Sequence, residues 1–295
     1  MSLCTRHHRR QHCAVYVVLL AVAVFSVALC TAFIARDQAV VSTDSWRRNA
    51  HTAAENGDDG GGVALIVETR TSKRLSVVVT NVLRVLPRTW IVQIAHGSAN
   101  AECVHQVRAH VERELGDESA GRLVFTALRV ETLDRDSYNE LLFTDAFWRS
   151  VVRERVLLFQ NDVYFCANTT DERIDAWSRR YALIGAPHTF MHDFYLSVRH
   201  WLLSGHWTVH FGNGGASFRW RSCMRAALRD TARLWWSNED SWFFFALSTM
   251  PHCPVAPVSV ARMVFVENSL PSEPQRLLAV HQRTYNCDAV HCLCL

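Results

Sequence analysis

The middle of the chain holds an apolar run that ends in amides and a carboxylate. Val156–Phe159 is continuously apolar, and Gln160, Asn161 and Asp162 follow it. Such a run is typical of a strand buried on both faces of a sheet. Open α/β sheets bind ligands at the carboxyl ends of their strands, which is where Asp162 would lie. Two interpretations remain open: Asp162 belongs to a ligand or metal site, or it caps the following turn.

A glycine cluster is the second candidate. Gly212, Asn213, Gly214 and Gly215 precede Arg219 by a few residues. We expect a tight loop here, because glycine adopts positive φ and lets a ligand approach the backbone. Exposed N–H groups in such a loop could hold an anion, and Arg219 could add bidentate phosphate contacts. The alternative is a plain turn before an edge strand.

An acidic pair is the third candidate. Glu239 and Asp240 follow Asn238 at the predicted start of a helix. The helix dipole stabilises carboxylates there and Asn238 is a suitable N-cap, so a structural role alone would explain the pair. The functional interpretation is a carboxylate base that takes a proton from a hydroxyl group. Nearby tryptophans such as Trp242 would suit a sugar ring, although a buried aromatic core is the commoner reason for them.

His281, close to the C-terminal end, is the fourth candidate. A single histidine of this kind is usually a surface or core residue, and the alternative is a metal ligand.

The segments that carry these candidates alternate between strand-like and helix-like patterns. This alternation indicates an α/β fold with a mostly parallel central sheet and helices on both faces. The predicted strands are 63–69, 90–95, 123–127, 156–159, 182–184, 216–220 and 263–266. The predicted helices are 72–86, 99–115, 136–152, 171–180, 222–236 and 241–248. Prolines make the region after 250 loop-rich.

The N-terminal region predicts a membrane anchor. Residues 14–35 carry no charge, and at about 1.5 Å per residue such a helix crosses a hydrocarbon core of about 30 Å. Basic residues precede it, which favours a cytoplasmic N-terminus. A cleaved signal peptide is the alternative, but the apolar run exceeds the usual h-region. We therefore expect a cytoplasmic tail (1–13), a transmembrane signal anchor (14–35), a flexible stem (36–62) and a catalytic domain (63–295).

Composition narrows the class of protein further. Hydrophobic residues make up 49% and charged residues 20% of the chain, as in globular proteins. The formal net charge is +3 and no basic cluster stands out, so we expect no nucleic-acid partner. Most of the ten cysteines follow the predicted anchor, where several could pair in an oxidising compartment.

Taken in order, these motifs resemble those of one group of proteins. The chain resembles glycosyltransferase-like proteins grouped as an uncharacterised domain-of-unknown-function family, related to the GT-A nucleotide-diphospho-sugar transferases. The resemblance covers most of 63–282. Its motifs are V-A-L-I-V-E-T-R, L-P-R-T-W-I-V-Q-I-A-H-G, Y-N-E-L-L, V-L-L-F-Q-N-D, I-G-A-P, G-N-G-G-A-S-F-R, N-E-D and A-V-H-Q.

The resemblance implies a single GT-A-like, Rossmann-like domain that binds a nucleotide-diphospho-sugar at the strand ends. GT-A enzymes usually hold the diphosphate through a divalent cation on an Asp-x-Asp triplet. Here Gln160 replaces the first acid, so Mn²⁺ or Mg²⁺ would depend on Asp162, donor oxygens, water and His281. The glycine cluster would border donor and acceptor, and Asp240, next to Glu239, would be the general base.

These expectations combine into a type II, single-pass membrane glycosyltransferase of the Golgi or another secretory-pathway lumen. It would transfer a sugar from a nucleotide-diphospho-sugar donor to a glycan, protein or lipid acceptor, by an inverting mechanism. The alternative is a catalytically inactive, membrane-tethered carbohydrate-binding or interaction module on the same fold, which the missing first acid motivates. A metal-dependent hydrolase ranks below both, because the sequence lacks paired carboxylates and histidine clusters at ligand spacing.

Overall fold

The structure, a computed structural model, describes residues 61–166, 169–188, 198, 211–233, 238–267 and 277–281. The predicted tail and anchor, and the stem up to residue 60, lie outside these ranges. Among the helices within them, none combines the length and the hydrophobicity that a membrane span needs.

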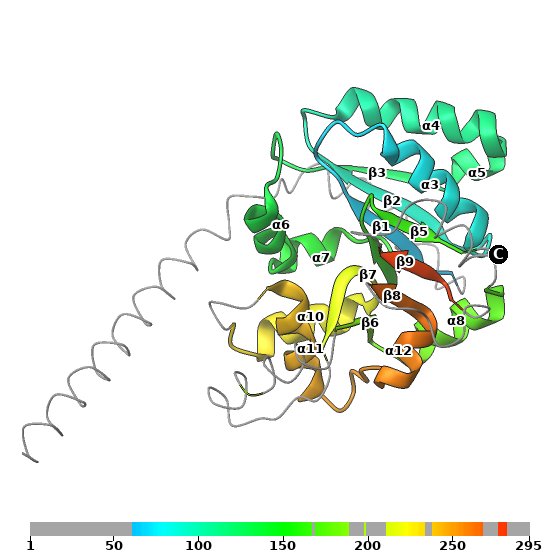
Figure 1. Cartoon of the computed structure of the whole chain (residues 1–295). Helices are drawn as coiled ribbons and strands as arrows, with labels where there is room; N and C mark the ends of the chain where they lie inside the picture. Colours follow the sequence, from blue (N-terminus) through cyan, green and yellow to red (C-terminus); the bar gives the residue numbers. More distant parts are fainter. Residues whose placement is uncertain are drawn as a thin grey trace, which may run out of the picture. The chain divides into compact units, whose positions relative to one another are not determined.

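A six-stranded sheet forms the centre of the described structure (Figure 1). From one edge to the other its strands are β3 (Leu123–Ala127), β2 (Ile91–His96), β1 (Val63–Val67), β4 (Arg155–Phe159), β7 (Gly212–Trp220) and β6 (Leu183–Pro187). Strand β7 is antiparallel to both of its neighbours, whereas the pairs among β1, β2, β3 and β4 are parallel. The predicted α/β fold is therefore confirmed with a mixed sheet, which departs from the mostly parallel prediction at β7.

A smaller sheet continues from the end of β4. It consists of β5 (Val163–Phe165), β9 (Ala279–His281) and β8 (Phe265–Glu267), with β9 antiparallel to β5 and parallel to β8. Asn81 supports the other edge of β5: its amide donates to the Phe165 carbonyl at 3.0 Å and its oxygen accepts from the Phe165 N–H at 2.8 Å. This sheet fixes the two segments that carry Asp162 and His281.

Helices pack around the central sheet. They are α3 (Arg74–Val85), α4 (Ala101–Leu115), α5 (Asp117–Gly121), α6 (Arg135–Leu142), α7 (Asp145–Ser150), α8 (Asp171–Arg180), α10 (Arg221–Asp230), α11 (Glu239–Ser248) and α12 (Val258–Val264). Figure 1 shows α3, α4 and α5 beside β1, β2 and β3, and α10 and α11 near β7. The α12 helix is a correction, because the sequence analysis expected loops in this region.

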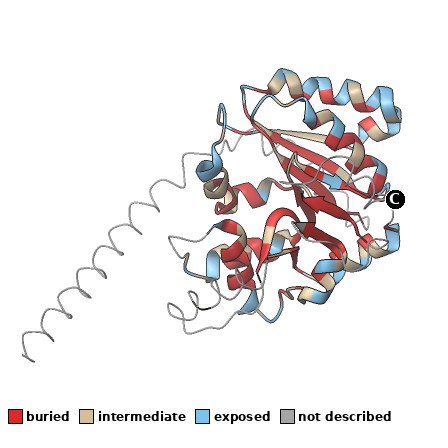
Figure 2. Ribbon diagram, viewed as in Figure 1, coloured by how far each residue is buried: buried red, intermediate tan, exposed pale blue. Residues whose placement is uncertain are grey.

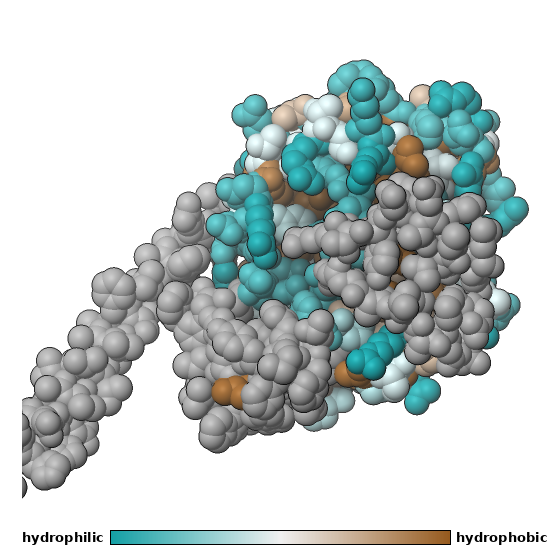
Figure 3. Space-filling view, in the orientation of Figure 1, coloured by the Kyte–Doolittle hydropathy of each residue, from teal (hydrophilic) through white to brown (hydrophobic). Residues whose placement is uncertain are grey.

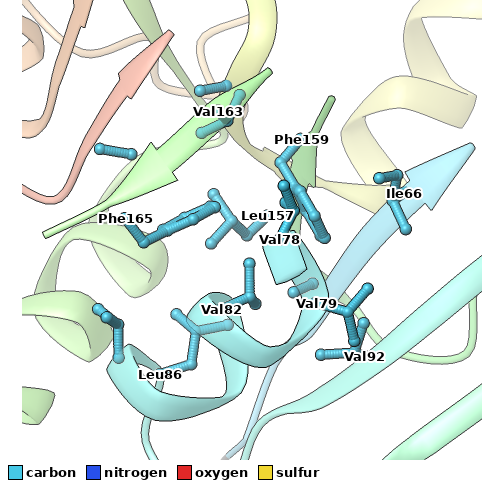
Figure 4. Close-up of a cluster of buried hydrophobic side chains, with 14 of the residues drawn as sticks. Ile66, Val78, Val79, Val82, Leu86, Val92, Leu157, Phe159, Val163 and Phe165 are labelled. Carbon is cyan, nitrogen blue, oxygen red and sulfur yellow. The ribbon is translucent and has the colours of Figure 1, made fainter. Parts of the chain in front are cut away.

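The main hydrophobic core lies between α3 and the sheets (Figure 4). Apolar residues of α3 recur at helical spacing and face side chains of β1, β2, β4 and β5, as a helix with one apolar face must. The labelled side chains are Ile66, Val78, Val79, Val82, Leu86, Val92, Leu157, Phe159, Val163 and Phe165. Figure 2 shows that the strands of the central sheet are mostly buried, which explains the apolar runs of β1 and of 156–159 in β4.

The outer side of α4 is polar. Only Val104, Val107 and Val111 of this helix are buried, at the spacing of a single helix face. The surface over α4, at the top of Figure 3, is correspondingly mostly hydrophilic.

The single helix predicted for 136–152 is wrong, because the chain forms α6 and α7 instead. Thr144 separates them with an extended backbone. Its hydroxyl accepts from the Phe147 N–H at 3.2 Å and donates to the Leu141 carbonyl at 2.8 Å. One side chain therefore ends the first helix and caps the second.

A disulfide links Cys223 of α10 to Cys253, which follows α11. Helix α11 lies inside the covalent loop of 30 residues that this bond closes.

Candidate functional site

Asp162 and His281 lie together at the end of β4. Asp162 occupies the turn between β4 and β5, and the pairing of β5 with β9 places His281 opposite Val163. Nε2 of His281 is 3.3 Å from Oδ1 of Asp162. The imidazole is buried, whereas the carboxylate is 29% exposed. The two predicted metal ligands are thus adjacent in the folded chain, with the carboxylate on the solvent side.

Strand β7 passes directly against this pair. The Gln160 N–H donates to the Gly215 carbonyl at 3.0 Å, which joins the end of β4 to β7. A Cβ atom on Gly215 would lie 2.5 Å from both Cε1 and Nε2 of His281. Only glycine allows the strand to approach the imidazole this closely.

The glycine cluster is an extended strand, so the predicted tight loop is wrong. Gly212–Gly215 form the first part of β7, and Gly116 is the only glycine with positive φ among the described residues. The N–H groups of the cluster are also engaged: Gly214 donates to Oδ2 of Asp240 at 3.4 Å, and Gly215 donates to Oδ1 of Asn213 at 2.6 Å. The cluster therefore provides close packing instead of the expected anion-binding loop.

Gly214 lies beside Glu239 and Asp240, the predicted acidic pair. A Cβ atom there would lie 2.5 Å from Oε1 of Glu239 and 2.7 Å from Nη2 of Arg219. Gly212 has a different neighbour, because a Cβ there would meet the Phe244 ring at 2.7 Å. Both glycines thus let β7 pack against α11.

Arg219 and Glu239 form a buried ion pair. Nη1 and Nη2 of Arg219 donate to Oε2 and Oε1 of Glu239 at 2.8 and 3.2 Å, and its Nε donates to Ser217 at 2.9 Å. Arg219 is only 1% exposed. The prediction that Arg219 contacts a phosphate directly does not fit this burial, because its donors face Glu239 and Ser217. Glu239 likewise is a partner of Arg219 and does not reach the surface.

Asp240 is the carboxylate of α11 that remains accessible. Its side chain is partly buried, and Oδ1 accepts from the Ser241 N–H at 2.6 Å. Burial raises the pKa of the Asp240 carboxyl, while the Ser241 N–H and the Arg219 charge oppose that rise. A raised pKa suits a group that must accept a proton near neutral pH. Asn238 occupies the N-cap position but makes no capping hydrogen bond with its side chain.

Glu68 and Arg70, which lie at the end of β1, were not among the predicted site residues. Glu68 is 3% exposed, and its carboxylate accepts from Nε of Arg70 at 2.9 Å and from Nδ2 of Asn161 at 2.5 Å. Arg70 itself is 68% exposed. Hydrogen bonds to Glu68 raise the pKa of the Arg70 guanidinium, and the charge of Asp162 adds to this effect. Ligands bind at the carboxyl ends of parallel strands, and this rule, which singled out Asp162 after β4, also applies to the residues that follow β1.

The analysis also missed Tyr138 of α6 as a site residue. Burial, together with the charge of Glu239, raises the pKa of its hydroxyl above the usual value, and the charge of Arg219 opposes this rise. The hydroxyl therefore stays neutral beside the acidic pair of α11.

The aromatic residues after Asp240 are not a sugar platform. Trp242 and Phe243 are fully buried, and the guanidinium carbon of Arg219 lies 5.6 Å from the centre of the Phe243 ring. They belong to the core, which was the commoner of the two interpretations.

The structure thus gathers the predicted residues at one place. His281, whose Nε2 is 3.3 Å from Asp162, packs against Gly215, and Asp240 accepts a hydrogen bond from the N–H of the neighbouring Gly214. Adjacent ligands of an octahedral cation with bonds of about 2.1 Å lie about 3 Å apart. The 3.3 Å separation in the Asp162–His281 pair fits such a cation. Within the described residues, no group of three or more His, Cys, Asp or Glu side chains could hold a metal ion, so donor oxygens or water would supply the other ligands.

Solved structures of glycosyltransferases align with this chain. The apo structure of the WbbM bifunctional glycosyltransferase aligns with a TM-score of 0.51 and 10% identity, over 78% of this chain and 47% of that one. The mannosyltransferase PcManGT from Pyrobaculum calidifontis, in complex with GDP-Man and Mn²⁺, aligns with a TM-score of 0.42 and 14% identity, over 80% and 70% of the two chains. The apo form of the glycosyltransferase GlyE of Streptococcus pneumoniae TIGR4 aligns with a TM-score of 0.43 and 11% identity, over 76% and 55%.

These similarities concern the fold, and this chain spans about half the length of WbbM. The WbbM alignment confirms the predicted resemblance to GT-A-type glycosyltransferases at the level of the fold. No curated protein matches the sequence. A family profile matches residues 124–281, which include every site residue from Tyr138 to His281. The chain belongs to that family, which is described as "Protein of unknown function (DUF5672)".

Proposed function

We propose that this protein is a glycosyltransferase that moves a sugar from a nucleotide-diphospho-sugar to an acceptor hydroxyl. The observation that carries the proposal is the position of β7 between the two halves of the site. Gly215 packs on His281 beside Asp162, and the next residue back, Gly214, contacts Asp240. A donor phosphate group and an acceptor hydroxyl could therefore meet along one short stretch of backbone.

The donor half comprises Asp162, His281 and Arg70. Asp162 and His281 would hold a divalent cation, whose charge would offset that of the diphosphate when it is bound. Arg70 adds a cation of the protein itself, which Glu68 orients with its carboxylate. Guanidinium groups are common ligands of phosphate oxygens, and Nη1 of Arg70 is not among the atoms that donate to Glu68. The burial of Arg219 makes Arg70 the better candidate for direct phosphate contact.

The acceptor half centres on Asp240. In the proposed reaction, Asp240 takes the proton of an acceptor hydroxyl while that oxygen bonds to the anomeric carbon of the donor sugar. The bond from this carbon to the diphosphate breaks, and the nucleoside diphosphate leaves with the electron pair. A single displacement of this kind inverts the configuration of the sugar. Arg219 and Glu239 position the start of α11, and thereby Asp240.

The cellular setting is part of the proposal. The apolar segment 14–35 predicts a type II, single-pass anchor, and 63–295 would then be the catalytic domain in the lumen of the Golgi or another secretory compartment. The Cys223–Cys253 disulfide supports an oxidising compartment, because such bonds are rare in the cytosol.

A transfer assay tests the proposal directly. The full chain, purified in detergent, is incubated with a panel of nucleotide-sugars and acceptor glycans, with Mn²⁺ and with a chelator. We expect release of nucleoside diphosphate that depends on the acceptor, and a loss of at least about 100-fold in Asp240→Asn, as for other general bases. Asp230→Asn, at the exposed end of α10, is the matched control. Full turnover in Asp240→Asn would remove the proposed base.

Gln160 stands where GT-A enzymes usually have the first acid of the metal-binding triplet. This substitution motivates one alternative, an inactive carbohydrate-binding module. Calorimetry distinguishes it from the enzyme. Binding of a glycan without binding of nucleoside diphosphates, in the presence of Mn²⁺, would support the module.

A further inference from the structure

Glu68 is a buried carboxylate that directly follows β1. It is only 3% exposed, and four N–H groups donate to its two oxygens. The backbone N–H and Nε of Arg70 donate to Oε1 at 3.0 and 2.9 Å. Nη2 of Arg70 and Nδ2 of Asn161 donate to Oε2 at 3.0 and 2.5 Å. An ionised carboxylate has about four lone-pair positions, so each of them has a donor here.

This arrangement argues against Glu68 as a metal ligand. Its lone pairs are engaged, and within the described ranges Glu68 does not complete a group of three or more His, Cys, Asp or Glu side chains that could hold a metal ion. The groups that it holds, Arg70 and Asn161, indicate its role instead.

These two groups come from the ends of neighbouring strands. Asn161 is 93 positions from Glu68 in the sequence and lies in the turn after β4, next to Asp162. Arg70 follows β1, and its side chain is 68% exposed although the carboxylate that holds it is buried. Two of the three guanidinium nitrogens donate to Glu68, which fixes the plane of the group, and Nη1 is not among these donors.

The backbone around Glu68 is held without help from the carboxylate. The Glu68 N–H donates to the Ala95 carbonyl at 3.0 Å. Nδ2 of Asn100 donates to the carbonyls of Glu68 and Arg70 at 2.7 and 3.3 Å, and its Oδ1 accepts from the Gly97 N–H at 3.1 Å. The loop should therefore keep its course when the carboxylate is changed.

We propose that Glu68 is a positioning residue, which directs Arg70 toward the diphosphate and ties this arginine to the turn that carries Asp162. A bound diphosphate would then meet the guanidinium and the cation on Asp162 at a fixed separation, because one carboxylate holds both supports. An ordinary surface ion pair is the alternative, but such a pair would neither bury its acid nor engage a side chain from another strand end. The inference rests on the donor half of the proposed function.

Glu68→Gln tests the role with little change in shape. An amide has one acceptor oxygen, and its NH₂ group would face the donors of Arg70 or Asn161, so the arginine loses part of its support. Glu118→Gln is the matched control, because Glu118 also pairs with an arginine but is 73% exposed. The affinity of the full chain for inorganic pyrophosphate, in excess Mn²⁺, is measured by calorimetry well below the melting temperature of each variant.

We expect Glu68→Gln to weaken pyrophosphate binding about tenfold, since hydrogen bonds between charged groups are lost. Glu118→Gln should bind as the wild type does. In a double-mutant cycle with Arg70→Ala, the effect of Glu68→Gln should shrink to about twofold or less, because the carboxylate acts through the arginine. Unchanged affinity in Glu68→Gln, or additive effects in the cycle, would overturn the positioning role.

Asn161→Leu removes the other partner of the carboxylate. We expect Mn²⁺ alone to bind about tenfold more weakly, as is usual when a group that supports a metal ligand is removed. Glu68→Gln should show a similar loss, and the double variant should lose no more than either single one. Unchanged Mn²⁺ affinity would overturn the link to Asp162, and so would additive losses, because Asn161 would then act on the cation directly.

Kinetics and binding together separate this inference from the proposed function. In the transfer assay Glu68→Gln should raise the donor KM and leave kcat nearly unchanged, because the candidate base lies in the other half of the site. A fall in kcat alone would contradict the role. If the wild type binds no pyrophosphate, the donor half and the inference fail together. If it binds pyrophosphate but transfers no sugar, only the proposed transfer fails, and the affinities still decide the role of Glu68.

Discussion

The guanidinium of Arg219 and the carboxylate of Glu239 meet through two hydrogen bonds, at 2.8 and 3.2 Å, where β7 packs against α11. Neither residue reaches the surface, with exposures of 1% and 4%. This pair joins the strand that borders the candidate metal ligands to the helix that carries the candidate base.

Glu239→Gln should therefore unfold more easily than the wild type. The substitution keeps the shape of the side chain but leaves the Arg219 charge buried without its counter-charge, a loss of about 3–5 kcal/mol in the free energy of unfolding. Urea denaturation of the full chain measures it. Arg229→Ala, which breaks an exposed pair with Asp230, is the control and should change little. Equal stability of wild type and Glu239→Gln would contradict the structural role of the pair.

Asp240→Asn should lower the activity and raise the thermal stability of the protein. Burial raises the pKa of the Asp240 carboxyl in the folded protein, so the ionised form disfavours folding at neutral pH, and an amide avoids that cost. The variant should melt at a higher temperature than the wild type at pH 7. The difference should shrink as the pH falls through the raised pKa, because the wild-type carboxyl then becomes neutral. A melting difference that grows toward acid pH would show that the pKa is not raised.

Gly215→Ala should disturb the Asp162–His281 pair. Its Cβ atom would lie 2.5 Å from the imidazole ring, which must move, and overpacking of this kind costs about 1–3 kcal/mol. We expect Mn²⁺ affinity to fall at least tenfold in calorimetry. At Gly121 a Cβ atom meets nothing within 4 Å, so Gly121→Ala serves as the control and should keep the affinity. Unaltered Mn²⁺ binding in Gly215→Ala would argue against a cation on His281.

Arg70→Ala should weaken the binding of nucleoside diphosphates. Hydrogen bonds to a charged partner contribute about 1.5–3 kcal/mol, which corresponds to roughly 10–100-fold in Kd. Arg70→Lys keeps the charge beside Glu68 but loses the planar fork. Its Kd for nucleoside diphosphates should lie between those of the wild type and Arg70→Ala. Arg88→Ala removes another exposed arginine, one that pairs with Glu118, and should have no effect. Wild-type affinity in Arg70→Ala would exclude the proposed contact.

Much of the fold was predictable because its signals are local. The first four strands of the central sheet are rich in apolar residues, and 123–127 was predicted with the bounds that β3 has. The convergence of Asp162, His281 and Asp240 was also predicted, as what the resemblance implies. The strand-end argument applies to Asp162 alone, because His281 comes from β9 of the small sheet and Asp240 from the start of α11.

The remainder depends on contacts between distant parts of the chain. The glycines of β7 suggested a loop because composition cannot distinguish positive φ from close packing, and here the neighbours are His281 and Glu239. Arg219 was predicted to reach a phosphate because nothing in the sequence indicates which acid it pairs with. Strand β9 has only three residues, too few for a recognisable pattern.

The Cys223–Cys253 bond ties together the two ends of the segment that contains α11. In a reducing environment this segment would lose its covalent clamp, while the hydrogen-bonded ladder of the central sheet would stay intact. Reduction would then leave the buried Arg219–Glu239 pair to hold the start of α11, and with it Asp240, against β7. The redox state of the compartment would therefore act on the acceptor half of the candidate site and spare the central sheet.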